Sequence, residues 1–301
     1  MRWRSLLDLM QSAQSIGILG GNGVYARHLI PRLIARGHTV RAIVRRPEAA
    51  GVARACGAEI RVADIFDADA LRAALTGCDL AINLATSLPG PSGRGDFALN
   101  DKLRRDGTPV WVEACRAAGA VRTIQQSIAM VHATGSEDWS DEDSQPADGS
   151  MPVLGPAVDA ALAMEQTVRD GSSECLILRG GLFYGPGTGF DADWFARAQA
   201  GKLRLPGDGS AFVSLVHISD MAQATVLAVE RWPGARTLIV CEDEPARWRD
   251  VFSYVATLAG TAAPEPGGAV RFPSFRVRNT RAREVLGWQP HYPSHRTGLA
   301  R

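Results

Sequence analysis

The chain has 301 residues, of which 46% are hydrophobic and 22% charged, so it can bury the core of one large domain or of two coupled domains. Its formal net charge of +1 gives no electrostatic basis for binding nucleic acid or an anionic membrane surface. The five cysteines are scattered without a C-x-x-C pair, which favours reduced thiols in a cytoplasmic protein over a disulfide framework.

Residues 1–14 form an N-terminal extension. Its apolar block (Leu6, Leu7, Leu9 and Met10) is too short and too interrupted for a signal peptide. No other stretch reaches the length needed to cross a membrane. We therefore expect a short amphipathic helix that leads into the first strand, and no membrane partner.

A short apolar run at residues 16–19 leads into a glycine-rich turn and then into a helical pattern over residues 24–35. The turn reads as G-x-G-x-x-A or as G-x-x-G-x-x-A, and its glycines let the backbone approach a pyrophosphate at the helix N-terminus. A turn without a ligand is the alternative, but the strand before it and the helix after it favour a dinucleotide site. The cofactor-binding residues predicted here are Gly20, Gly21, Asn22, Gly23, Val24 and Tyr25.

Strand-like and helical patterns then alternate along the chain. Strands are expected at residues 39–44, 59–63, 80–84, 122–126 and 175–178, and helices at 68–75, 99–118 and 157–169. Alternation of this kind is typical of βαβ units, so the predicted fold class is α/β, a Rossmann-type doubly wound parallel sheet. Any ligand should lie along the carboxyl ends of the strands.

The pattern is less regular after residue 181. A glycine-proline loop is expected at residues 183–189, a proline-punctuated linker at 264–273 and a last helix at 279–286. An acidic stretch (Glu137, Asp138, Asp141, Glu142 and Asp143) is interpreted as a solvated loop, and no metal site is predicted. We therefore divide the chain into the extension (1–14), an NAD(P)-binding core (15–180) and a mixed region (181–301). The mixed region adds the last strands and helices of the core and a small C-terminal substrate lobe.

The residues at the end of the second strand distinguish proteins that bind NADP from proteins that bind NAD. It carries no acidic residue at Val44 and is followed by Arg45 and Arg46, which favours the 2′-phosphate of NADP over the free ribose of NAD. An ordinary solvated turn is the alternative. Asp64, after the third strand, is positioned to reach the adenine amino group. The segment that closes the fourth strand (Asn83, Leu84, Ala85 and Thr86) would place small residues under the nicotinamide ribose.

These motifs, taken in this order, resemble those of the extended and atypical short-chain dehydrogenase/reductases, the NAD-dependent epimerase/dehydratase group. The resemblance covers nearly the whole chain. It continues in L-R-G-G-L-F-Y-G-P-G at residues 178–187, in L-V-H-I-S-D-M-A at 215–222 and in N-T-R-A-R-E-V-L-G-W-Q-P at 279–290. It implies this fold and this cofactor site.

The catalytic Tyr-x-x-x-Lys of that group is missing. Residues 163–166 match the helix segment that follows the pair, which places Ala157 at the tyrosine position and Ala161 at the lysine position. No Y-x-x-x-K occurs anywhere in the chain. An alanine can neither transfer a proton nor lower the pKa of a neighbour, so the usual acid–base chemistry does not carry over.

Three residues are the candidates for a replacement. The resemblance places Ser127 where a strand-end serine polarises a substrate carbonyl, although Ile128 competes for that position. His132 stands at the tyrosine of the family's V-Y-G turn, and Tyr184 lies in the loop that borders the nicotinamide. Of the two credible proton donors, His132 and Tyr184, we favour Tyr184.

Together these features predict a cytoplasmic NADP-binding oxidoreductase or epimerase-like enzyme that acts on a small organic substrate. A homodimer is compatible with the sequence. Two other functions stay open: a catalytically silent NAD(P)-sensing regulator, and a non-redox lyase, isomerase or cyclase on the same fold.

Overall fold

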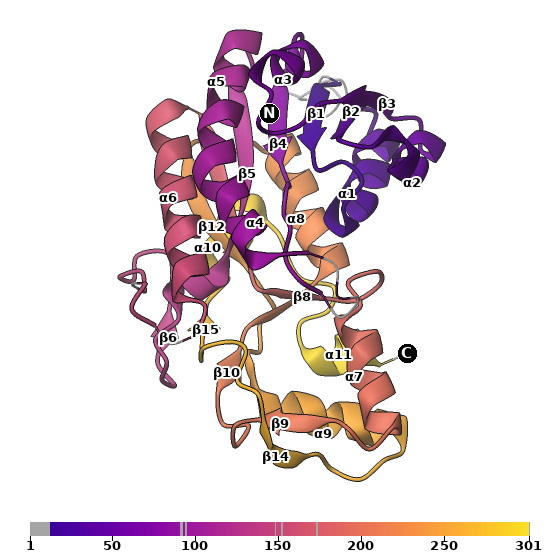
Figure 1. Ribbon diagram of the computed structural model, residues 1–301, viewed down its shortest axis with the longest axis vertical. Coiled ribbons are helices and arrows are strands. Elements are labelled where there is room, and N and C mark those ends of the chain that lie inside the picture. Colours follow the sequence, from indigo (N-terminus) through magenta and orange to yellow (C-terminus); the bar gives the residue numbers. More distant parts are fainter. Residues whose placement is uncertain are drawn as a thin grey trace, which may run out of the picture.

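The protein was analysed as a computed structural model that describes residues 13–90, 93, 95–147, 149–151, 153–172 and 174–300. The expected N-terminal amphipathic helix lies outside these residues, apart from the last positions before the first strand. The chain folds into an upper lobe built on a large sheet and a smaller lower lobe (Figure 1).

The upper lobe contains a seven-stranded sheet in which every neighbouring pair of strands is parallel. In sheet order the strands are β12 (Arg236–Val240), β7 (Cys175–Gly180), β5 (Arg122–Ile128), β4 (Leu80–Asn83), β1 (Ser15–Leu19), β2 (Thr39–Val44) and β3 (Glu59–Val62). The central strand β4 is buried at all four residues, and β7 is buried at all six. Their continuous apolar runs are what a parallel sheet with helices on both faces requires. The predicted fold class is confirmed.

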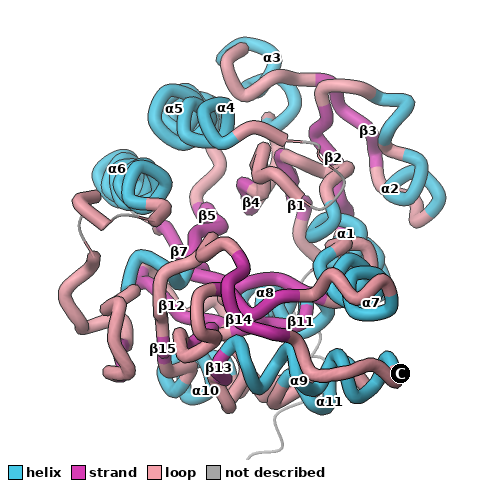
Figure 2. Tube along the Cα trace, turned by 60° about the horizontal axis from the view of Figure 1, so that its bottom comes forward, coloured by secondary structure: helices cyan, strands magenta, loops and turns pink. Residues whose placement is uncertain are grey.

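Helices cover both faces of this sheet (Figure 2). On one face lie α3 (Ala68–Leu75), α5 (Thr108–Ala118) and α6 (Gly155–Gly171), and on the other α1 (Val24–Ala35), α2 (Gly51–Ala55) and α8 (Ile218–Glu230). The helix α8 comes from the C-terminal half of the chain and packs beside α1 in the main hydrophobic cluster.

The helix expected at residues 99–118 is interrupted. It begins as α4 (Phe97–Lys102), passes through one π-helical turn, η3 (Leu103–Gly107), and continues as α5. Pro109 lies in the first turn of α5 and has no N–H to donate to the preceding turn, which accounts for the change of hydrogen-bond register.

The lower lobe is made of short elements from distant parts of the chain. Four two-stranded pairs are formed by β8 (Leu182–Tyr184) with β11 (Leu215–His217), β9 (Arg204–Pro206) with β14 (Glu265–Gly268), β10 (Phe212–Val213) with β13 (Ala246–Arg247), and β6 (Trp139–Ser140) with β15 (Arg276–Val277). The remaining helices of this lobe are α7 (Phe190–Gln199), α9 (Trp248–Ala259) and α11 (His295–Leu299), whereas α10 (Thr280–Leu286) packs against β12 and α8 of the upper lobe.

Two sequence expectations are corrected in this lobe. The predicted loop at residues 183–189 begins inside β8, and the predicted linker at 264–273 contains β14. Both segments pair with strands distant along the chain, and each is too short for its own residue pattern to predict a strand. Trp194 and Trp248 meet edge to face with ring centroids 6.0 Å apart, and both are buried in the core of this lobe.

Candidate active site

The glycine-rich turn sits at the carboxyl end of β1. The backbone N–H groups of Gly20 and Gly21 both donate to the carbonyl oxygen of Ile43, at 3.1 Å each, which ties the turn to β2. Gly20 has a φ of +78°, and a Cβ there would lie 2.9 Å from the backbone of Leu84. A Cβ at Gly21 would lie 2.8 Å from the Cβ of Ala42. Only glycine fits at either position.

Helix α1 starts directly after this turn at Val24. No side chain caps its N-terminus, and its first turn holds no acidic residue. Its N–H groups and the positive end of the helix dipole are therefore free to bind an anion, and the glycines leave space for one. This cradle fits the pyrophosphate of a dinucleotide.

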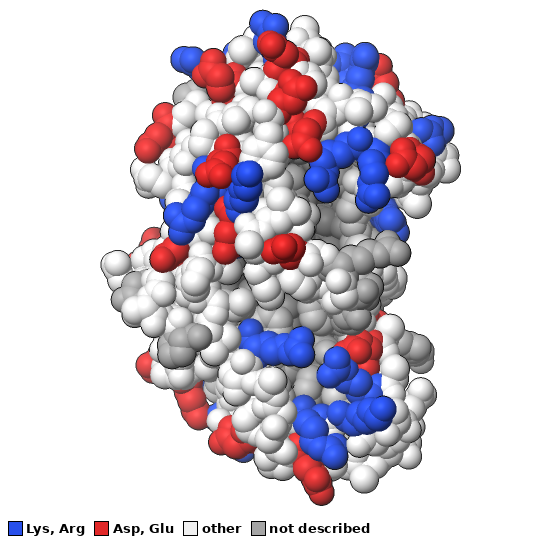
Figure 3. Space-filling view, in the orientation of Figure 1, with Lys and Arg blue, Asp and Glu red and all other residues white. Residues whose placement is uncertain are grey.

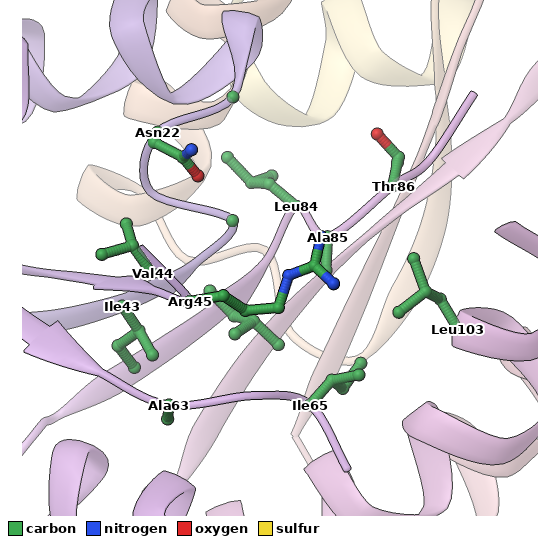
Figure 4. Close-up of a pocket in the computed structure, with 13 residues that line it drawn as sticks. Asn22, Ile43, Val44, Arg45, Ala63, Ile65, Leu84, Ala85, Thr86 and Leu103 are labelled. Carbon is green, nitrogen blue, oxygen red and sulfur yellow. The ribbon is translucent and has the colours of Figure 1, made fainter. Parts of the chain in front are cut away.

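A cavity of about 110 Å³ opens beside the turn, between the carboxyl ends of β1, β2, β3 and β4 (Figure 4). It is lined by Leu19, Gly20, Asn22, Gly23, Ile43, Val44, Arg45, Ala63, Ile65, Leu84, Ala85, Thr86 and Leu103. Seven predicted cofactor residues thus share one cavity: Gly20, Asn22, Gly23, Arg45, Leu84, Ala85 and Thr86. Asn83 positions the last of these segments, since its Oδ1 accepts a hydrogen bond of 3.0 Å from the Ala85 N–H.

Sequence reasoning missed several lining residues. Leu19, Ile43 and Ala63 end or follow strands, and their place at the sheet edge was a usable signal. Ile65 and Leu103 come from segments whose approach to the cavity depends on tertiary packing, so the chain gives no local sign of it. Figure 4 shows Arg45, Leu84, Ile65 and Leu103 grouped around the same space.

The two predicted arginines are placed differently. Arg45 lines the cavity with its side chain 61% exposed, and its Nη1 lies 4.0 Å from Oδ2 of Asp64. Arg46 is exposed and does not line the cavity. Basic side chains gather on this face beside the hollow between the two lobes, over the region of β1, β2 and α1 (Figure 3). A guanidinium at this edge suits an anionic group.

Gly21, Val24 and Tyr25 do not line the cavity. Tyr25 is buried, and its hydroxyl is hydrogen-bonded to that of Thr225 on α8. Its ring meets that of Phe183 edge to face at 5.6 Å. Burial raises the pKa of the Tyr25 hydroxyl, so it stays protonated and holds α1 against α8.

Ser127 and His132 belong to one buried hydrogen-bond network with Glu165 and Arg179. The Ser127 Oγ donates to Oε1 of Glu165 at 2.6 Å, and Arg179 binds both oxygens of the same carboxylate. Arg179 also contacts Nε2 of His132 through its Nη1. Burial, reinforced by the charge of Arg179, lowers the pKa of His132 to about 4. The imidazole is therefore neutral near pH 7.

Tyr184 lies apart from that network, at the end of β8. Its side chain is fully buried, and its hydroxyl donates to Oε1 of Glu242. Burial raises the pKa of Tyr184 strongly, and the neighbouring carboxyl of Glu242 raises it further. Burial also raises the pKa of Glu242 to about 8. None of Ser127, His132 and Tyr184 lines the cavity at the glycine turn.

The positions at which the family resemblance places the catalytic tyrosine and lysine are apolar. Ala157 and Ala161 lie on α6 with exposed fractions of 6% and 0%. Ile128 ends β5 and packs in the same hydrophobic cluster as Ala161. The side chain of Ser127 points instead toward α6 and Glu165, as alternation along a strand dictates for neighbouring residues.

The fold and the site define a class. A parallel sheet with a glycine turn, an uncapped helix start and a cavity at its carboxyl edge is a nicotinamide-dinucleotide site of the short-chain dehydrogenase/reductase type. The chain belongs to the NAD(P)H-binding family, whose model matches residues 20–197. It is thus an NAD(P)-dependent enzyme of the oxidoreductase and epimerase class.

Two curated relatives and one solved structure illustrate the similarity. A 3-diazoavenalumate denitrifying reductase from a Streptomyces species is 34% identical over 94% of this chain and 98% of its own length. A 2-alkyl-3-oxoalkanoate reductase from Stenotrophomonas maltophilia is 30% identical over 85% and 78%. The fold is shared with a UDP-glucose 4-epimerase from Thermotoga maritima, with a TM-score of 0.78, 20% identity and coverage of 95% and 96%.

Membrane spans and metal sites were sought in the described ranges. No helix there is both long and apolar enough to cross a membrane. Over those same residues, no three His, Cys, Asp or Glu side chains are grouped so that they could hold a metal ion.

Proposed function

We propose that this protein is an NADPH-dependent reductase that replaces the diazonium group of a small organic acid with hydrogen. The observation that carries the proposal is that buried alanines, Ala157 and Ala161, stand at the tyrosine and lysine positions of the usual catalytic pair. A reaction that takes up no proton from the protein has no need of a tyrosine or lysine there. Reduction of a ketone, by contrast, needs a proton for the new hydroxyl group.

Bound NADPH supplies a hydride, and a hydride is all that the carbon of a diazonium group needs. The C–N bond breaks and its electron pair leaves with N₂, while the hydride pair forms the C–H bond. Charge balances without a proton, because the positive charge of the diazonium group is neutralised by the hydride. The task left to the protein is to bind and orient the substrate and to exclude water.

The state of the three candidate donors supports this assignment. The proton of Ser127 is committed to Glu165, so the hydroxyl offers no hydrogen to a substrate carbonyl. His132 is neutral near pH 7, and Tyr184 is buried against a carboxyl group that holds its hydroxyl hydrogen. We therefore give all three structural and positioning roles.

Two further features shape the proposal. The denitrifying reductase matches almost the whole chain, and both curated relatives described above are named for carboxylate substrates. We infer a carboxylate on the substrate of this enzyme as well. We also propose NADP(H) as the cofactor, with Arg45 binding the 2′-phosphate and Arg46 assisting, because no acidic side chain stands at the end of β2.

The test compares two substrates, 3-diazoavenalumate and a 2-alkyl-3-oxoalkanoate. With the first, we expect NADPH oxidation, N₂ release by mass spectrometry, and deuterium on the product carbon from cofactor deuterated at C4. In D₂O with ordinary NADPH, that carbon should carry no deuterium. A heat-denatured sample controls for direct reduction by the cofactor. Turnover of the oxoalkanoate alone, or of neither substrate, would overturn the proposal.

A further inference from the structure

A buried arginine lies between the dinucleotide cavity and α6. Arg104 is in the π turn η3, with only 5% of its surface exposed, and its Nη1 donates to the carbonyl oxygen of Ala157 at 2.8 Å. The residue before it, Leu103, lines the cavity. The π turn thus places Leu103 against the cofactor cavity and Arg104 against α6, the helix that lacks the catalytic pair.

The charge of Arg104 has no carboxylate partner. Among the described residues, no Asp or Glu oxygen lies within 4.0 Å of its guanidinium. The two carboxylates that act on it from further away are Asp101 and Glu165, and Glu165 is already bound by Arg179 and Arg169. Burial lowers the pKa of Arg104 to about 10, so the group is still a cation at neutral pH.

One turn earlier, a second donor has no acceptor. Asn100 is 1% exposed; its Oδ1 accepts from the Ser87 N–H at 3.1 Å, and its Nδ2 has no hydrogen-bond partner. Residues four apart in a helix share a face, so Asn100 and Arg104 lie on the same side of α4 and η3. Arg104 has the Ala157 carbonyl as an acceptor but no counter-ion, and the Asn100 amide has no acceptor. A buried cation without a counter-ion and a buried amide without an acceptor are both costly unless an anion completes them.

We propose that Arg104 and Asn100 bind the carboxylate of the substrate and so set its specificity. This inference rests on the proposed function for the substrate class. A carboxylate has two oxygens in one plane, which suits the fork of a guanidinium with an amide donor one turn away on the same helical face. Binding there would place the acid end of the substrate beside the backbone of Ala157 and next to the cavity-lining Leu103, and so fix it away from the reacting carbon.

The test measures binding without turnover. Cinnamate and methyl cinnamate are titrated calorimetrically into the protein saturated with NADP⁺. Wild type should bind the acid about 10- to 100-fold more tightly than the ester, the range expected for a charge-assisted hydrogen-bond pair. Arg104→Gln should abolish that preference and leave the affinity for NADPH unchanged. Arg105→Gln, at the exposed neighbouring position, is the matched control and should keep the preference.

A second variant guards against a folding defect at Arg104. Asn100→Asp is nearly isosteric and places a negative charge beside the acid, so it should weaken cinnamate binding and leave the ester unaffected. No preference in wild type, or a preference that survives Arg104→Gln, overturns the inference. An equal loss of NADPH affinity also overturns it, because the guanidinium would then serve the cofactor. These readouts do not depend on N₂ release, so they separate failure here from failure of the proposed reaction.

Discussion

The guanidinium of Arg179 binds both carboxylate oxygens of Glu165 inside the protein, through Nε at 2.9 Å and Nη2 at 2.6 Å. Glu165 has no exposed surface, and it also accepts the hydroxyl of Ser127. Burial alone would raise the pKa of Glu165, but the hydrogen bonds and charge of Arg179 outweigh it and hold this pKa below its usual value. The pair thus joins β5, β7 and α6 at one point.

Removing one partner of this pair should be severely destabilising. We expect Glu165→Ala to lower the free energy of unfolding by about 3–5 kcal/mol, because a buried guanidinium loses its counter-ion. Arg169→Ala removes a half-exposed partner of the same carboxylate and should cost less than about 1 kcal/mol. Urea denaturation measures both. Equal losses of unfolding free energy in the two variants would show that the buried ion pair contributes no more to stability than the half-exposed one.

Arg45 should decide the choice of cofactor. Arg45→Ala is expected to weaken NADPH binding about 10- to 100-fold, since a charge-assisted phosphate contact is lost, and to leave NADH binding nearly unchanged. Arg46→Ala should give a smaller loss, because that side chain lies outside the cavity. Calorimetric titration of both cofactors tests this. Tighter binding of NADH than of NADPH by wild type would contradict the assignment.

His132 and Tyr184 should be dispensable for the chemical step. A general acid contributes about 10²- to 10⁴-fold to a rate, so its removal would be unmistakable. We expect His132→Phe and Tyr184→Phe to keep kcat for the diazo substrate within about threefold of wild type, well short of that range. Stopped-flow measurement of NADPH oxidation at a temperature where both variants are folded gives the answer. A loss of two orders of magnitude in either would restore that residue as the proton donor.

The buried carboxyl of Glu242 should make stability depend on pH. Its pKa of about 8 in the folded protein lies above the ordinary 4.5, chiefly because of burial. Its contribution to stability is complete below pH 4.5 and declines as pH rises through 8, because the unfolded chain ionises first. Glu242→Gln should therefore gain melting temperature relative to wild type between pH 6 and pH 8. A constant difference between the two proteins over that range would contradict the raised pKa.

Restoring the family's pair should not restore its chemistry. Ala157→Tyr with Ala161→Lys inserts two large side chains where α6 is packed, which should cost about 1–3 kcal/mol of stability. We expect altered turnover of the diazo substrate and no reduction of the oxoalkanoate. Ala163→Lys, at a partly exposed position on the same helix, is the control for stability. Efficient ketone reduction by the double variant would show that the pocket still accommodates the usual mechanism.

The sequence predicted the glycine turn and six of the seven strands of the sheet, because both depend on local patterns, and it missed only the edge strand β12. An apolar run such as residues 16–19 that is followed by glycines is compatible with few structures other than a strand and a turn. The order of neighbouring strands is then restricted by the right-handed crossovers that connect them. The pairing of β8 with β11 depended instead on contacts between segments about thirty residues apart, each only three residues long.

Local sequence patterns did not determine the face of the sheet to which each side chain points. Ser127 and Ile128 are neighbours on β5, and a shift of one residue exchanges the faces to which they point. Only the position of Glu165 on α6, brought near by the fold, fixes Ser127 on the helix side. The role of Arg104 was hidden for a similar reason, since its burial depends on the π turn and on the backbone of Ala157.

The position of β12 affects how the chain is made. This strand pairs with β7 and closes one edge of the sheet, yet it lies at Arg236–Val240, after much of the lower lobe. During synthesis on the ribosome, β7 keeps an open edge with unpaired N–H and C=O groups until Val240 has emerged. The nascent chain therefore offers a strand-pairing surface to chaperones, or to another copy of itself, while residues 181–240 are being translated. The dinucleotide fold is completed late, although its binding loop is made first.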